Sequence, residues 1–176
     1  MLRSAKEIAY IATFCALLIG GQYLLAAVPG VEVVTLLFVC YAYAFGVVRG
    51  CLCATAFSLL RQFVFGFFPT VLILYLFYYN LLCLCFGLLG NAWRGKEKER
   101  LVFIVLLACA GTLLFNLIDV AINAIWIGYG KEAFKVYFVA SWSFTLPQLI
   151  CTAVTVAFGF LPLNRAFQYI YRNLRG

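Results

Sequence analysis

An aspartate and two asparagines lie together in a strongly apolar part of the chain. Asn116, Asp119 and Asn123 recur at i, i+3 and i+7, and this spacing gathers them within an arc of about 60° on one face of a helix. One carboxylate and two amides can donate to and accept from the edge of a polar molecule. Because an ionisable group at membrane depth is costly unless it faces a cavity or a partner, this face predicts a site for a small polar ligand.

A single arginine lies inside another apolar stretch. Arg61 follows Arg49 at a helical distance of roughly 18 Å, which places its guanidinium in the far half of a ~30 Å hydrocarbon layer. Two partners are open to it: Asp119, in a structural ion pair, or a charged edge of the ligand. The turn that precedes the second apolar stretch adds Glu32, which we expect at the mouth of the bundle where the first two stretches meet.

Further polar and aromatic side chains recur at similar depth. In the fourth and sixth stretches they are Tyr75, Tyr78, Tyr79, Asn80, Ser141, Trp142, Ser143, Thr145 and Gln148. Such residues predict a water-accessible pocket that is open to the outside, in which Tyr75, Tyr79 and Trp142 offer stacking surface and Asn80 offers hydrogen bonds. Alternatively, Tyr78, Trp126 and Trp142 belong to the aromatic belt at the membrane surface, and Asn80 forms an interhelical hydrogen bond.

The elements that position these residues are expected to be membrane-spanning helices. Of the 176 residues, 66% are hydrophobic and only 11% are charged, with a mean hydropathy of +1.06, so the chain lacks the polar surface that a water-soluble domain needs. The ~20-residue span rule predicts an all-α, integral membrane six-helix bundle in a single domain, residues 1–176. The expected spans are residues 5–27, 33–48, 50–66, 70–92, 101–127 and 136–162.

The basic residues predict how this bundle is oriented. Six spans place both termini on one face, and the basic residues of that face are Arg3, Lys6, Arg49, Arg94, Lys96, Lys98, Arg100, Arg165, Arg172 and Arg175. Only Lys131 and Lys135 lie opposite, so the positive-inside rule predicts cytoplasmic termini. The net charge of +7 therefore reports topology and does not indicate nucleic-acid binding.

The cysteines and the other nucleophiles do not indicate metal or catalytic chemistry. All eight cysteines fall in predicted spans, and the chain has no histidine and no C-x-x-C pair, so neither a metal site nor a disulfide framework nor a cofactor is expected. An intramembrane enzyme using Ser141 or Ser143 is a weaker alternative, because no histidine is present as a base and no paired carboxylates share a helix face.

Small residues recur every four positions in two places. The first series is Ala12, Ala16 and Gly20, and the second is Gly46, Gly50, Ala54 and Ser58. Small residues allow helices to approach closely, either within the bundle or against a partner.

Several segments, taken in order, resemble one membrane-protein family. They are Ala12-x-x-x-Ala16, VPGVEVVTLLFVCYAYAFG, SLLRQFVFGFFPTVLILYLFYYN and LPLNRAF. Over nearly its full length the chain resembles a substrate-binding S-component of the energy-coupling factor (ECF) vitamin transporters of bacteria, and the third and fourth stretches resemble S-components linked to the cobalamin pathway. Where relatives carry tryptophans in the fourth span, this chain has Tyr75, Tyr78 and Tyr79.

The resemblance implies a multi-pass protein of the bacterial cytoplasmic membrane that captures a vitamin or vitamin precursor from outside. On this interpretation Glu32 and Thr35 serve an outer gate, and the other binding residues are Arg61, Tyr75, Tyr79, Asn80, Asn116, Asp119, Asn123 and Trp142. Ala12 and Ala16 dock a transmembrane coupling subunit. The chain has no phosphate-binding loop, so ATP hydrolysis is expected on two separate ATPase subunits.

A small multi-span scaffold of the cell-shape type is the main alternative. It would have a similar length and similarly basic inner loops but no ligand. The polar residues at outer depth distinguish the two, since a scaffold leaves them unexplained.

Overall fold

The computed structural model describes residues 5–25 and 33–175, and within them every regular element is a helix. The helices are α1 (Ala5–Leu25), α2 (Val34–Phe45), α3 (Val47–Phe65), α4 (Pro69–Ala92), α5 (Leu101–Ile127) and α6 (Lys131–Arg175). The prediction of an all-α fold is thus confirmed for the described residues. Among the described helices, five are long and apolar enough to cross a membrane, as expected of a membrane-embedded protein.

The expected second span is shorter than the sequence indicated. α2 has 12 residues, which is about 18 Å of helix and too little to cross a hydrocarbon layer of ~30 Å. It ends at Gly46, whose φ of 86° is a backbone conformation that favours glycine. Since α3 begins at the next residue, Val47, the chain reverses direction here with a single-residue connection.

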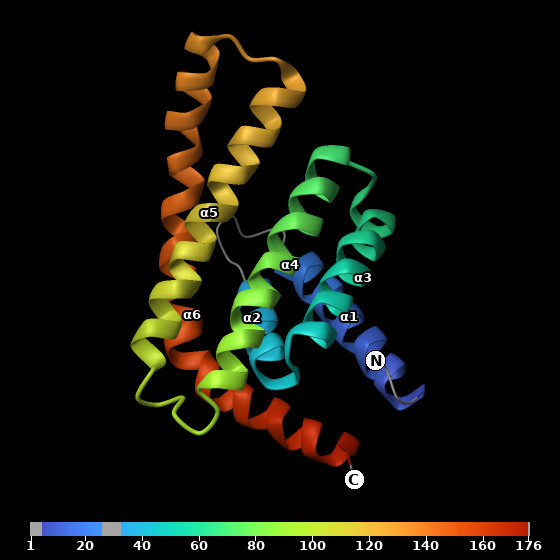
Figure 1. The fold of residues 1–176 in the computed structure, drawn as a ribbon. Helices are drawn as coiled ribbons and strands as arrows, with labels where there is room; N and C mark the ends of the chain where they lie inside the picture. The colour runs from blue at the N-terminus through green and yellow to red at the C-terminus, as the bar shows by residue number, and fades with distance from the viewer. Residues whose placement is uncertain (1–4, 26–32, 176) are drawn as a thin grey trace.

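α2 lies at the centre of the bundle and contacts all five other helices. Every residue from Val34 to Phe45 is buried except Leu37, and α4 covers one side of this helix (Figure 1). A helix that is apolar around its whole circumference is stable only inside a larger assembly or a bilayer. The apolar composition of α2 therefore reflects its place in the core.

Glycines allow α4 to approach the α2–α3 connection closely. A Cβ at Gly87 would lie 2.6 Å from the backbone nitrogen of Val47, and a Cβ at Gly90 would collide with the carbonyl oxygen of Tyr43. Gly50 of α3 is similarly tight, since its Cβ would meet Cys83 at 3.1 Å. In the second series of small residues, Gly50, Ala54 and Ser58 are buried and therefore serve packing within the bundle.

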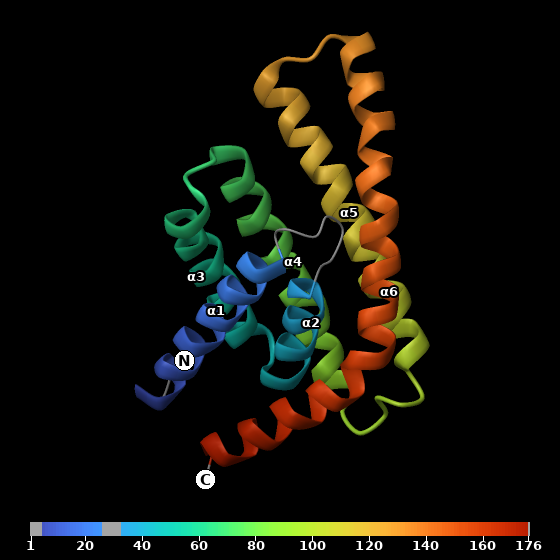
Figure 2. The same ribbon diagram turned by 180° about the vertical axis from the view of Figure 1, so that it is seen from behind.

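α6 is a single helix of 45 residues that contains Pro147 and Pro162. Its last part turns away and runs across the end of the bundle (Figures 1 and 2), and proline is the usual cause of such a bend because it removes a backbone hydrogen bond. The ring of Phe167 packs edge-on against Phe14 of α1, at 5.5 Å between centroids. Tyr171 contacts Phe45 at 5.3 Å, so this segment is fastened to α1 and α2.

Most basic residues belong to segments at the end of the bundle where α1 and α3 begin, α4 connects to α5, and α6 ends (Figure 2). In the described part of the chain they are Lys6, Arg49, Arg94, Lys96, Lys98, Arg100, Arg165 and Arg172. We call this the basic end. Lys131 and Lys135 lie at the opposite end, where Lys135 pairs with Glu132, while Arg3 and the side chain of Arg175 are outside the described residues. Which end faces the cytoplasm remains a prediction.

Glu97 ties the α4–α5 connection to α6 at the basic end. Its carboxylate accepts hydrogen bonds from the backbone nitrogen of Gly95 at 3.1 Å and from Nε2 of Gln168 at 2.9 Å. Partial burial raises the pKa of Glu97, but these donors outweigh burial, so the pKa of Glu97 lies below its ordinary value. The ionised form of Glu97 therefore stabilises the fold.

Glu97→Gln is expected to lower the melting temperature slightly at neutral pH. A carboxyl group whose pKa is depressed on folding contributes stability above its unfolded pKa, about 4.3, and loses that contribution as the pH falls through the folded value. Thermal melting of the wild type and the variant across pH 3 to 8 checks this. The two curves should converge below about pH 4; a difference that is constant across the range would contradict the assignment.

Candidate functional site

Arg61 is held in a polar group formed by α1, α3 and α4. Its Nε donates to Oε1 of Gln22 at 3.0 Å, and Nε2 of Gln22 donates to the hydroxyl of Tyr75 at 3.0 Å. The guanidinium also lies over the rings of Tyr75 and Phe65, at 4.5 and 4.7 Å from their centroids. Stacking on an aromatic face suits the flat, weakly hydrated guanidinium group.

One nitrogen of the Arg61 guanidinium lacks a hydrogen-bond acceptor among the described residues. Nη1 of Arg61 is buried and has no hydrogen-bond partner among the described residues. Within the same part of the chain Arg61 makes no ion pair with Asp119. The ion pair between Arg61 and Asp119, one of the two alternatives from the sequence, is therefore not formed in the structure. A buried charged donor without an acceptor is costly and rare, which makes this atom a candidate for ligand contact.

Asn80 forms a hydrogen-bonded pair with Thr55 across α3 and α4. Nδ2 of Asn80 donates to the hydroxyl of Thr55 at 3.2 Å and to the carbonyl of Leu76 at 2.7 Å. The hydroxyl of Thr55 donates back to Oδ1 of Asn80 at 3.4 Å. This is the interhelical hydrogen bond that the sequence left as an alternative.

A second polar group joins α5 to α6. Asn116 donates through Nδ2 to Oε1 of Gln148 at 3.1 Å, and the hydroxyls of Thr112 and Thr152 lie 3.0 Å apart. Gln148, Thr112 and Thr152 are all buried. The predicted hydrogen-bonding face of α5 thus contacts α6, and its amide at Asn116 already has a protein partner.

Asp119 is paired along its own helix. Nδ2 of Asn123 donates to Oδ1 of Asp119 at 3.0 Å, which fits the shared helix face expected from their spacing. No cation lies within ion-pair distance of the Asp119 carboxylate in the described part of the chain. Asp119 and Asn123 therefore pair with each other on α5. Arg61 makes its contacts elsewhere, with Gln22 of α1 and Tyr75 of α4.

Aromatic rings separate the two polar groups. Tyr75 contacts Phe115 at 5.9 Å and Tyr79 at 5.1 Å, while Tyr79 stacks on Phe38 of α2 at 4.5 Å. Phe115 immediately precedes Asn116, so the ring of Tyr75 lies between the Arg61 group and α5. Tyr78 is 2% exposed, which rules out its assignment to the aromatic belt.

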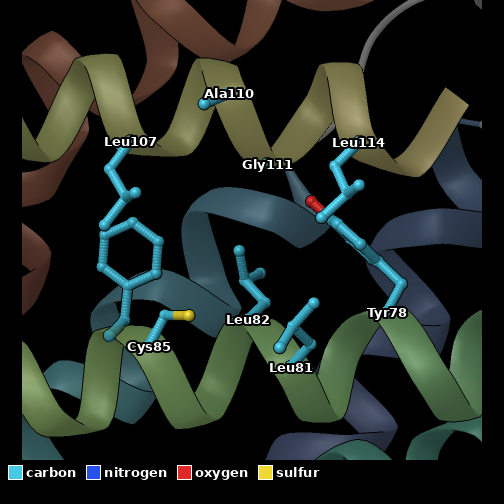
Figure 3. Close-up of a pocket in the computed structure, with 9 residues that line it drawn as sticks. Tyr78, Leu81, Leu82, Cys85, Leu107, Ala110, Gly111 and Leu114 are labelled. Carbon is cyan, nitrogen blue, oxygen red and sulfur yellow. The ribbon is translucent and has the colours of Figure 1, made fainter. Parts of the chain in front are cut away.

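An apolar cavity of about 140 Å³ lies between α4 and α5. Leu81, Leu82 and Cys85 of α4 face Leu107 and Leu114 of α5 (Figure 3). Its polar edge is the hydroxyl of Tyr78, which would lie 3.4 Å from a Cβ at Gly111. The cavity suits apolar atoms and offers almost no hydrogen bonding.

A second small cavity, about 130 Å³, lies between α5 and α6 and includes two of the predicted site residues. Asn116 and Trp142 line it with Ser141 and Thr145. Trp142 is 41% exposed, so its ring forms the rim. Arg61 and Asp119 are not among the residues that line this cavity.

The structure brings only some of the predicted site residues together. The ring of Tyr75 lies against Arg61, and Tyr79 contacts Tyr75. Asn116 and Trp142 line the same cavity. Thr35, by contrast, is buried in the first turn of α2. Glu32 lies outside the described residues. The prediction missed Gln22, the partner of both Arg61 and Tyr75. The sequence did contain an indication of this role, because Gln22 is a polar amide within a long apolar stretch.

The expected docking residues lie on the surface of α1. Ala12 and Ala16 are exposed, and a Cβ added at Gly20 would meet no atom within 4 Å. The small-residue face of α1 is therefore not used for packing against the described helices. All eight cysteines are free thiols, and no group of potential metal ligands occurs among the described residues.

Comparison of the chain with protein-family models, with curated proteins and with solved structures found no match.

Proposed function

We propose that the chain is the substrate-capture subunit of an ECF-type importer, which binds a vitamin or vitamin precursor from outside the bacterial cytoplasmic membrane. Its termini lie inside the cell, and separate coupling and ATPase subunits supply the energy. The arrangement of the sequence and its basic residues support this topology. The function follows from the resemblance to S-components, and the polar group around Arg61 supports ligand binding.

The observation that carries the proposal is the free Nη1 of Arg61. Arg61 lies in a predicted span, its guanidinium is fixed by Gln22 and Tyr75, and Nη1 is buried without a described partner. A scaffold gains nothing from a buried guanidinium nitrogen without an acceptor at this depth. A ligand with a carboxylate, phosphate or carbonyl oxygen would satisfy it, and the adjacent Tyr75 ring would bind a flat apolar part.

We propose the polar residues of α5 and α6, which the rings of Tyr75 and Phe115 separate from Arg61, as the other side of the site. Asn116 and Asp119 lie on α5, and Phe115 of the same helix contacts Tyr75 of α4. A ligand bound beside Tyr75 would therefore approach α5 from the side of α4. In the described structure Asn116 is bonded to Gln148 and Asp119 to Asn123. Binding would therefore exchange these internal hydrogen bonds for hydrogen bonds to the ligand.

The exposed small-residue face of α1 supports a partner on that side. Ala12 and Ala16 stand free of the described helices, as close docking of a coupling subunit requires. This face agrees with the resemblance of the first helix to S-components, and it makes the coupling subunit the expected partner.

Analysis of small molecules released from the purified protein tests the proposal. The protein is extracted in mild detergent, denatured, and the released compounds are identified by mass spectrometry. One compound, recovered in roughly molar proportion and rebinding in calorimetry, supports the proposal. Repeated preparations that contain no ligand, with no response to a panel of vitamins, would favour the scaffold alternative.

A further inference from the structure

A polar cavity of about 340 Å³ lies at the basic end, between the α4–α5 connection and the end of α6. Its wall includes the cations Lys96, Lys98 and Arg165 and the amides of Asn164 and Gln168. Gln168 also lines a neighbouring cavity of about 260 Å³, together with Arg94 and Arg172. A volume of a few hundred Å³ accommodates a small ligand or a lipid head group.

Asn164 is the buried polar residue of this wall. It is 2% exposed, and its Oδ1 has no hydrogen-bond partner among the described residues. Buried amide oxygens are nearly always satisfied, so an orphan acceptor in a cavity wall indicates a ligand that carries a donor. Arg165, the next residue, is exposed beside it and offers a charge to the same ligand.

The charges of the two cavities favour an anion. The acids of the first wall are Glu97 and Glu99, and the carboxylate of Glu97 is already bonded to Gly95 and Gln168. Among the described residues, no acid lines the second cavity, whose wall includes Arg94 and Arg172. Cations therefore outnumber acids around the shared Gln168, which suits a phosphate ester.

An exposed apolar stripe leads away from the cavity along α6. Val154, Phe158 and Leu161 recur at i, i+4 and i+7, which places them on one helix face. Leu161 lines the cavity, and the side chains of Val154 and Phe158 are 51% and 79% exposed. A polar cavity continuous with an apolar stripe matches a head group and its acyl chain, whereas free phosphate would use only the cavity.

We propose that this cavity binds an anionic glycerophospholipid whose head group carries a hydroxyl, with phosphatidylglycerol as the probe. The phosphate lies between Lys96 and Arg165, the head-group hydroxyl donates to Oδ1 of Asn164, and an acyl chain lies along Leu161 and Phe158. This inference does not depend on the transport function, because it concerns the opposite end of the bundle from the Arg61 group.

Lipid titration followed by native mass spectrometry tests the proposal. The full-length protein in detergent is titrated with phosphatidylglycerol, with phosphatidylmethanol, which has the same charge but no hydroxyl, and with phosphatidylcholine. The double variant Lys96→Gln/Arg165→Gln removes two exposed cations. Lys131→Gln/Lys135→Gln is the matched control at the opposite end. Inorganic phosphate is added as a competitor at millimolar concentration.

The expected order of affinity is phosphatidylglycerol, then phosphatidylmethanol, then phosphatidylcholine. Lys96→Gln/Arg165→Gln should weaken phosphatidylglycerol binding about tenfold or more, since each cation near the surface contributes measurably to anionic-lipid binding. The control should bind as the wild type does. Equal binding of phosphatidylglycerol and phosphatidylmethanol would overturn the role of Asn164. Displacement by inorganic phosphate, or equal loss in the control, would overturn the lipid site itself.

Discussion

Gly90→Ala is expected to lower the melting temperature of the protein by roughly 5 °C or more, since overpacking typically costs 1–3 kcal/mol. The new methyl group would clash with the carbonyl oxygen of Tyr43, near the C-terminal end of α2. A backbone carbonyl cannot rotate away as a side chain can, so α4 must move out from α2. Thermal melting in detergent, followed by circular dichroism and size-exclusion chromatography, measures the effect.

Gly20→Ala is the matched control for this substitution. Gly20 is also in a helix, but a Cβ there would meet no atom within 4 Å. Its melting temperature should stay close to that of the wild type, as for surface substitutions, which usually change stability by no more than about 0.5 kcal/mol. If both variants melt alike, the close approach of α4 to α2 is wrong.

Arg61→Ala is expected to weaken binding of the released ligand by roughly 10-fold to 100-fold, because a hydrogen bond to a charged group contributes about 1.5–3 kcal/mol. The substitution removes the free Nη1 and the cation that lies over Tyr75. Isothermal titration calorimetry of the purified variant measures the change. Arg61→Lys should recover only part of the affinity, since an ammonium group lacks the planar shape that stacks on the ring.

Lys135→Ala is the control for the loss of a positive charge. Lys135 pairs with Glu132 at the surface, away from the polar groups around Arg61, and its removal should leave affinity unchanged. The melting temperature of Arg61→Ala must also be measured, so that weaker binding is not confused with partial unfolding. Wild-type affinity in a folded Arg61→Ala protein would exclude Arg61 from the site, whatever the ligand is.

The fold was largely readable from the sequence, because apolar runs at the length of a span and turns marked by charge or glycine leave few alternatives. The expected spans 70–92 and 101–127 placed the α4–α5 connection correctly. The error at α2 arose because hydropathy does not distinguish a spanning helix from a short buried one. Gly46 carried the missing signal, but its positive φ depends on the tertiary reversal between α2 and α3.

The site was less predictable than the fold. Periodicity correctly placed Asp119 and Asn123 on one face, where they hydrogen bond. It could not show which helix that face meets, so Gln148 as the partner of Asn116 and Gln22 as the partner of Arg61 were not foreseen. Pairings between helices depend on rotation about each axis, and single-sequence patterns do not fix that rotation.

The central position of α2 has a mechanical consequence. Since this short helix touches each of the other five, no outer helix can slide past it without disturbing shared side-chain contacts such as Tyr79 on Phe38. Tightly packed interiors transmit displacement instead of absorbing it. Any tilt of the protein against its surroundings should therefore carry α2 and the helices around it as one body.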